Sequence, residues 1–188
     1  MDPRTGLANG PLARLARAAA RLITFWAILG GLGACALALM TAASAVSNLL
    51  FAKPFAADHE LIKHVIAVVI FMFLPYCQIA GANVTVDIFT ERMGERAKSV
   101  MAVFASLFAL IFSAVLLRQM YFGYLSYRNY VEVTPVLKLP LWTAFPPILA
   151  SLALLFIAAL ITAGEGVRKL TGRAPILPHP RALSEEPA

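Results

Sequence analysis

The sequence predicts an all-α integral membrane protein with four transmembrane helices, an amphipathic N-terminal segment, and a short interfacial helix between the second and third spans. Composition is the first reason: 60% of the 188 residues are hydrophobic, 14% are charged, and the mean hydropathy is +0.77. Soluble domains average about 45–50% apolar and about 25% charged residues. The second reason is that four apolar stretches are each long enough for a helix to cross a bilayer. They are residues 22–51, 61–80, 99–122 and 141–163.

Three regions follow from these spans. Residues 1–21 form a basic cytoplasmic segment, residues 22–167 form the four-helix transmembrane domain, and residues 168–188 form a tail that we expect to be disordered. The basic segment has two interpretations: an amphipathic helix along the inner membrane surface, or a solvated flank that only sets the topology. The apolar run that follows continues to Phe51, which is too long for a cleavable signal peptide. We therefore expect an uncleaved anchor.

The basic residues predict the orientation of the chain. The net charge is +6, but Lys and Arg bracket the apolar runs instead of clustering on one polar element, which argues against nucleic-acid binding. With the N-terminus inside, eleven of the 16 Lys and Arg residues fall on one side of the membrane. The positive-inside rule therefore predicts a multi-pass protein with both termini in the cytoplasm.

Two faces of the first span are suited to helix packing. Ser44, Ser47 and Asn48 form a polar stripe at i, i+3 and i+4, and in lipid such side chains more often face another helix than the acyl chains. Gly30 and Gly31 form a smooth face that allows close approach of a neighbouring helix. Both faces are candidates for contact with a partner protein.

The first connection begins with a helix break at Lys53-Pro54. Asp58 and Glu60 then open the second span and place negative charge at the positive end of the helix dipole. His64 lies close enough to this end to reach the membrane interface.

The second connection carries two candidate structural residues. Gly81 is expected to end the second span, because glycine readily adopts the left-handed conformation found after helix C-termini. Asp87 is placed to cap a short interfacial helix that leads into the third span.

The third connection is rich in aromatic residues and prolines. Tyrosines within residues 121–130 predict a belt at the membrane interface. Pro140 stiffens the loop, and Trp142 is expected to anchor the fourth span at the interface. The Pro146-Pro147 pair leaves two options: the regular helix starts at the prolines, or its first turns are kinked.

The chain lacks the side-chain patterns of intramembrane chemistry. Charged residues are absent from the middle of the four spans, and no paired carboxylates, His pair for haem, or phosphate-binding glycine loop is present. Cys35 and Cys77 fall inside apolar runs without CxxC spacing, so we expect neither redox chemistry nor a metal, and no cofactor. The pattern indicates a scaffold or accessory subunit. The alternatives are a stand-alone membrane enzyme or electron-transfer subunit that uses His59, His64 or the tyrosines, and a small exporter.

Three motifs, in order, carry a resemblance to a known family. Glu60-Leu61 opens the second span, GANVTVD at residues 81–87 closes it, and TPVLKLPLW at residues 134–142 precedes the fourth. On these motifs and the four-span topology, the chain resembles the small membrane subunit of tripartite ATP-independent periplasmic (TRAP) transporters, the DctQ type. Asn83 stands where that family usually has His.

The resemblance implies a small permease subunit of the bacterial inner membrane that is not an enzyme and has no substrate site of its own. Its implied partners are a large multi-spanning permease subunit, which holds the sodium and substrate sites, and a periplasmic solute-binding protein, which delivers an anionic, carboxylate-bearing solute. The small subunit would brace the large one in the lipid bilayer.

Overall fold

The computed structural model describes residues 11–52, 55, 58–81 and 95–170. Almost all of them lie in four long helices and one short 3₁₀ helix. The long helices are α1 (Pro11–Phe51), α2 (Asp58–Ala80), α4 (Glu95–Asn129) and α5 (Phe145–Leu170), and the 3₁₀ helix is η1 (Leu141–Ala144). All four long helices are long and apolar enough to cross a membrane. The predicted all-helical class with four spans is therefore confirmed.

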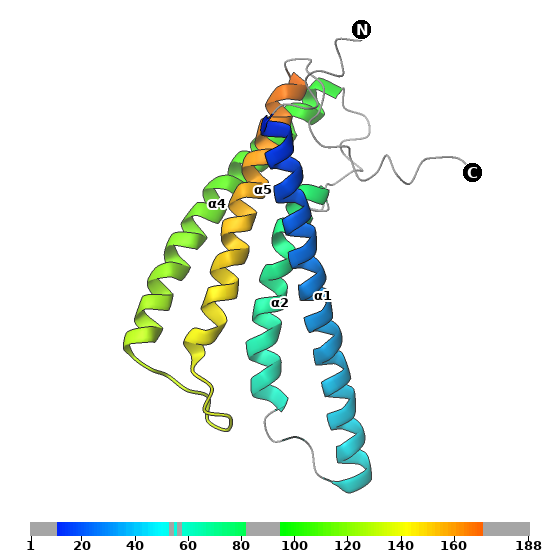
Figure 1. Cartoon of the computed structure of the whole chain (residues 1–188), viewed down its shortest axis with the longest axis vertical. Coiled ribbons are helices and arrows are strands. Elements are labelled where there is room, and N and C mark those ends of the chain that lie inside the picture. Colours follow the sequence, from blue (N-terminus) through cyan, green and yellow to red (C-terminus); the bar gives the residue numbers. More distant parts are fainter. Residues whose placement is uncertain (1–10, 53–54, 56–57, 82–94, 171–188) are drawn as a thin grey trace, which may run out of the picture.

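α5 occupies the middle of the bundle. It packs against α4 on one side and against α2 on the other, and α2 in turn packs against α1 (Figure 1). The first residues of α1 and the last residues of α5 lie at one end of the bundle, which we call the tail end (Figure 1). The loop at residues 130–141 lies at the opposite end, which we call the loop end (Figure 1).

The core follows from this central position of α5. Ile148, Leu152 and Leu155 form a buried cluster along α5. Side chains from both neighbouring helices pack against this cluster, namely Val68, Phe71 and Leu74 from α2 and Leu116, Leu117 and Met120 from α4. By contrast, the outer helices α1 and α4 leave many large apolar side chains exposed, among them Leu39, Leu49, Phe104 and Phe108.

Glycines allow α1 and α2 to approach closely. A Cβ atom on Gly30 would lie 3.0 Å from the Cβ of Met72, and one on Gly33 would lie 3.1 Å from Cγ2 of Val69. The glycine face of α1 is therefore covered by α2 of the same chain. From the sequence, this face was a candidate contact for a partner protein. At Gly30 and Gly33, α2 of the same chain covers it instead.

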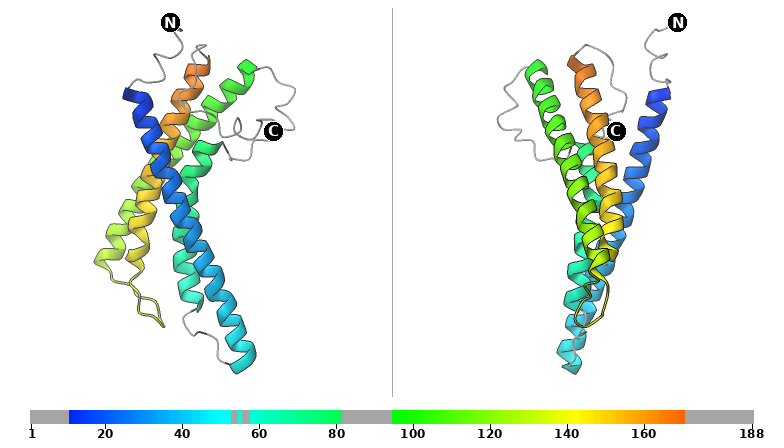
Figure 2. Two further views of the ribbon diagram at one scale, coloured as in Figure 1. Left: turned by 45° about the vertical axis from the view of Figure 1, so that its right-hand side comes forward. Right: turned by 90° about the vertical axis from the view of Figure 1, so that its left-hand side faces the viewer.

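In the part of the chain that the structure describes, hydrogen bonds between side chains join α5 to α1 and to α2. Nε1 of Trp26 on α1 donates to Oγ of Ser151 on α5 at 2.9 Å, and Oγ of Ser151 donates to the carbonyl oxygen of Pro147 at 2.8 Å. The left view of Figure 2 shows α1 crossing in front of α5. Nε2 of Gln78 on α2 donates to Oγ1 of Thr162 on α5 at 3.0 Å. Polar groups buried in apolar surroundings are stable when they are paired in this way.

The helices extend beyond the spans that hydropathy marks. α1 begins at Pro11, so residues 11–21 continue directly into the first span without a turn. α1 contains 41 residues and is therefore about 60 Å long at 1.5 Å per residue, twice the roughly 30 Å thickness of the hydrocarbon layer. α4 likewise continues to Asn129 through most of the tyrosine-rich segment. Hydropathy detects the part of a helix that lipid covers, whereas Arg, Leu and Ala are good helix formers in water as well.

Two predictions about helix ends are settled by the backbone. Pro146 and Pro147 occupy the first turn of α5, after η1, where a missing N–H has no partner to lose. The option in which the regular helix starts at the prolines is therefore correct. Gly81 follows the last residue of α2 with a φ of +63°, as predicted for a helix C-terminus. Asp87 and most of the expected interfacial helix lie outside the described residues.

Candidate functional site

The loop at residues 130–141 has a defined, hairpin-like backbone. Val133 and Pro140 form an isolated antiparallel bridge, and the amide of Leu141 donates to the carbonyl oxygen of Glu132 at 3.0 Å. Thr134 closes the tip twice, because its amide donates to the carbonyl oxygen of Leu139 at 2.9 Å and its Oγ1 accepts from the amide of Leu139 at 3.0 Å. The backbone reverses at Lys138, whose φ is +52°.

Glu60, in the first turn of α2, holds the tip of this loop. Its Oε1 accepts a hydrogen bond from the amide of Val136 at 2.9 Å, and its Oε2 accepts one from the amide of Leu137 at 3.0 Å. Hydrogen bonds to an ionised carboxylate are stronger than those between neutral groups. The two carboxylate oxygens of Glu60 therefore bind the successive amides of Val136 and Leu137. In the described hydrogen bonds, neither amide donates to another group of the loop.

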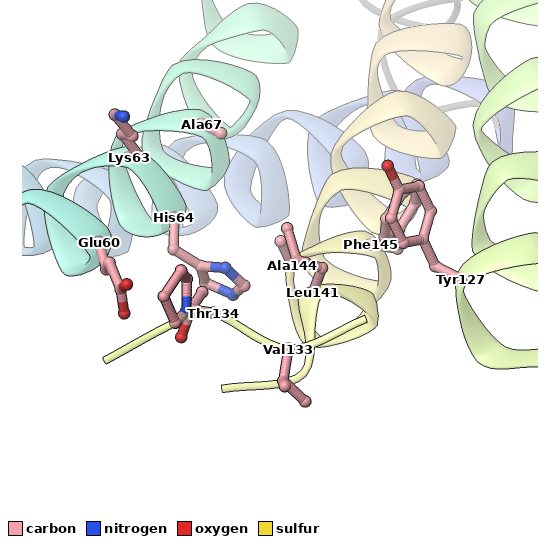
Figure 3. Close-up of a pocket in the computed structure, with 11 residues that line it drawn as sticks. Glu60, Lys63, His64, Ala67, Tyr127, Val133, Thr134, Leu141, Ala144 and Phe145 are labelled. Carbon is pink, nitrogen blue, oxygen red and sulfur yellow. The ribbon is translucent and has the colours of Figure 1, made fainter. Parts of the chain in front are cut away.

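His64 makes a second connection from α2, one helical turn after Glu60. Its Nε2 lies 3.0 Å from Oγ1 of Thr143, and the same Oγ1 donates its single hydrogen to the carbonyl oxygen of Pro140 at 2.7 Å. Thr143 therefore accepts from His64, and the proton of the bond belongs to Nε2. Figure 3 shows Glu60 and His64 on the side of α2 that faces the loop.

Aromatic side chains pack the end of α4 against the start of α5, next to the loop. The ring of Phe145, the first residue of α5, lies 5.3 Å from the ring of Tyr127 and 6.3 Å from that of Tyr124, measured between centroids. Gly123 leaves room for this contact, since a Cβ there would lie 3.2 Å from Cε1 of Phe145. The loop is thus bonded to α2 at its tip, and the helices on either side of it, α4 and α5, pack against each other through these rings.

A cavity of about 490 Å³ lies between these supports. It is open on one side, and its lining comes from α2, the loop, η1, the start of α5 and the end of α4 (Figure 3). Among the residues that the structure describes, no group of three or more His, Cys, Asp or Glu could hold a metal ion. Glu60 binds two backbone amides of the chain itself and His64 binds the hydroxyl of Thr143, so these polar groups fix the shape of the loop.

The predicted site residues lie in different parts of the structure. Glu60 and Pro140 both lie at the loop end, where Glu60 binds the loop that Pro140 closes, and Trp142 follows in η1 with its side chain half-buried. Ser44 is buried on α1, and its Oγ accepts a hydrogen bond from the amide of Phe55 at 3.4 Å. Ser47 is half-buried, whereas Asn48 is exposed, so the polar stripe does not act as one surface. Gly81 lies at the other end of α2.

The role of His64 and the loop amides was not foreseen from the sequence. His64 was expected only to reach the interface. The spacing of Glu60 and His64 is i, i+4, which places two polar side chains on one face of a helix and could have suggested a common partner. The partner itself, a loop more than seventy residues later, had no comparable signal.

Four long apolar helices whose polar side chains bond within the bundle, together with a loop fixed on one end, define a polytopic α-helical membrane protein. Residues 37–169 match the family described as tripartite ATP-independent periplasmic transporters, DctQ component. The match covers well over half of the chain, and the chain belongs to this family, as the small component of a TRAP transporter. It is a family of transporter components and not of enzymes. No curated protein sequence and no solved structure shows a significant match.

Proposed function

We propose that this chain is the small permease subunit of a sodium-coupled TRAP transporter that takes up an anionic, carboxylate-bearing solute. In this role it is a scaffold for the large transport subunit and helps to dock the periplasmic solute-binding protein. The observation that carries the proposal is the family match over residues 37–169, within which the Glu60 and Thr-Pro motifs meet in space. A tripartite system implies both partners.

The outer helices support a scaffold role. α1 and α4 present exposed apolar side chains over much of their length, including Leu39 at 72% and Phe108 at 71% exposure. Apolar surface of this extent must be covered by lipid or by another membrane protein. Asn48 remains exposed on α1 and is a candidate for a polar contact with the large subunit.

The loop end supports a docking role. Under the positive-inside rule the tail end, with Arg14, Arg17, Arg21 and Arg168, lies in the cytoplasm of a bacterial inner membrane. The loop end then faces the periplasm. There the loop presents Val136 at 54% and Tyr130 at 76% exposure on a backbone that Glu60 immobilises. A rigid surface loses less conformational entropy on binding than a mobile one, which favours docking.

The first experiment is an affinity pull-down of a tagged full-length chain from its native membranes in mild detergent, followed by mass spectrometry. The expected result is stoichiometric recovery of one much larger multi-spanning protein. Elution of the chain alone, from membranes shown to contain that protein, would contradict the proposal. Reconstitution of the recovered complex with the binding protein, with and without a sodium gradient, then tests uptake of labelled carboxylates.

Docking has a separate test at the loop tip. Val136→Cys carries a photoactivatable cross-linker at the proposed periplasmic surface, and Leu15→Cys, an exposed position near the tail end of α1, is the matched control. Cross-linking of the solute-binding protein at position 136 and not at position 15 is the expected result. Cross-links to a cytoplasmic protein at position 136 would reverse the proposed orientation.

A further inference from the structure

Arg118 is a charged residue on a largely apolar face of α4. Its guanidinium lies 5.3 Å from the centroid of the Phe122 ring, and its side chain is exposed. Among the described residues, no carboxylate pairs with it. It precedes Tyr124, which packs near the start of α5, by six residues, so its Cα lies about 9 Å deeper in the bundle. A cation at such a depth is costly unless its head reaches the interface or finds an anion.

The side chain of Arg118 is directed toward the loop end. Phe122 lies four residues after Arg118, one turn closer to the end of α4, and the guanidinium is placed over that ring. Long basic side chains in membrane helices extend toward the head-group layer in the same way. Tyr121 lies on the same side of the helix, three residues after Arg118, and is 52% exposed.

An apolar groove between α4 and α5 runs past Arg118, from Tyr121 on the side of the loop end to Ala114 and Phe156 on the side of the middle of the bundle. It has a volume of about 520 Å³ and is lined by Ala114, Leu117, Arg118 and Tyr121 of α4 and by Leu149 and Phe156 of α5. Leu149 lies near the loop end of α5, and Phe156 is seven residues further along. The groove therefore extends about 10 Å along the helices.

We propose that Arg118 and this groove form a binding site for a phospholipid with an anionic head group. The guanidinium holds the phosphate, since its planar set of donors matches phosphate oxygens in a bidentate arrangement. One acyl chain lies in the groove between α4 and α5, and the Tyr121 ring covers the glycerol region. The guanidinium, placed over Phe122, lies toward the loop end of the groove, and Ala114 and Phe156 line the part toward the middle of the bundle, which matches the order of head group and acyl chain in a lipid.

The charge at the groove favours an anionic lipid over an apolar helix of a partner protein. Of the described residues that line the groove, Arg118 is the one cation, and a phosphate head group supplies the anion that its guanidinium needs. A carboxylate of the large subunit is the competing partner for Arg118, and the experiment separates the two.

The test is native mass spectrometry of the full-length chain, extracted in mild detergent together with the proteins that co-elute and titrated with phosphatidylglycerol. Arg118→Gln should weaken binding of the tightest lipid about tenfold, because a charge-assisted bond is lost. Arg128→Gln, at an exposed arginine in the last turn of α4 outside the groove, is the matched control and should bind as the wild type does. Inorganic phosphate alone should not compete, since it lacks the chain that fills the groove.

A second variant tests the groove without touching the charge. Ala114→Phe fills the groove from its exposed wall and should lower lipid affinity while Arg118 remains. Equal lipid affinity of Arg118→Gln and the wild type would overturn the proposal. Loss of the large subunit from Arg118→Gln with unchanged lipid binding would also overturn it and would assign Arg118 to a protein contact. Both variants alter exposed side chains, and a circular dichroism spectrum checks that they fold.

Discussion

Oε2 of Glu60, in the first turn of α2, accepts a hydrogen bond of 3.0 Å from the amide of Leu137, a residue 77 positions later in the chain. This bond ties the start of the second span to the loop before the fourth. Two of the motifs on which the family resemblance rests, Glu60-Leu61 and residues 134–142, are therefore in direct contact. The loop owes its shape to a side chain of another helix, in addition to its own hydrogen bonds.

Glu60→Gln should loosen the loop tip. An amide side chain has only one oxygen that can accept, so Val136 or Leu137 loses its partner. Faster hydrogen exchange at these two amides is expected, with little change in the helices. Glu132→Gln, which alters an exposed carboxylate in the same loop, is the control. Exchange rates that match the wild type in Glu60→Gln would show that the carboxylate does not hold the loop.

The hydrogen bond of His64 predicts its tautomer. Because Oγ1 of Thr143 donates to Pro140, the neutral imidazole must carry its proton on Nε2. The nitrogen chemical shifts of His64 in the labelled protein should show this form. A neutral ring protonated on Nδ1 would contradict the geometry.

Neighbouring glycines of α1 should respond in opposite ways to alanine. Alanine is favoured over glycine in a helix by about 1 kcal/mol. At Gly31 the new Cβ lies 4.0 Å from Cζ of Phe73, an ordinary contact, and Gly31→Ala should be neutral or stabilising. At Gly30 the new Cβ lies 3.0 Å from Cβ of Met72, and the overpacking should cost about 1–3 kcal/mol. Unfolding in mixed micelles measures both, and equal stabilities would show that α1 and α2 are not packed this closely.

The bond between Trp26 and Ser151 should show energetic coupling. Trp26→Phe removes the donor and should lower the free energy of unfolding by about 1 kcal/mol. Ser151→Ala leaves the half-buried indole N–H without its acceptor and should cost about 1–3 kcal/mol. The double variant should cost less than the two changes added together. Strict additivity would mean that the residues do not interact.

Gly81 should be sensitive to any side chain. Its φ of +63° is a left-handed conformation, which costs a residue with a Cβ about 1–2 kcal/mol. Gly81→Ala should therefore lower stability. Gly164→Ala is the control, because Gly164 lies within α5 and a Cβ there meets nothing within 4 Å. If Gly81→Ala and the wild type have the same free energy of unfolding, position 81 does not adopt the left-handed conformation.

Local signals predicted the spans and several of their ends. Hydropathy located four helices, because the length of an apolar run is itself the requirement for crossing a bilayer. Gly81 and the Pro146-Pro147 pair marked helix ends, because backbone restrictions act within a few residues. For residues 11–21 the sequence left open a surface helix or a solvated flank, and it did not predict that they continue α1 without a turn, because hydropathy does not register a helix that extends into water.

Local signals did not predict which groups the polar side chains bind, because the partners lie far away in the sequence. Glu60 was expected to serve the dipole of its own helix, and it binds the backbone of a distant loop instead. Ser44, Ser47 and Asn48 share a helical spacing, yet one is buried, one is half-buried and one is exposed. The spacing defines a face of the helix but not what covers it.

The sequence by itself determined that the chain is a four-span helical membrane protein and, through short motifs, which family it resembles. These properties depend on residues close together in the chain. Only the tertiary structure decided that α5 lies in the middle, that the glycines of α1 receive α2, and that Glu60 and His64 hold the loop at residues 130–141. Apolar helices can pack in several orders with similar burial of surface, so the order is selected by close contacts and hydrogen bonds between distant residues.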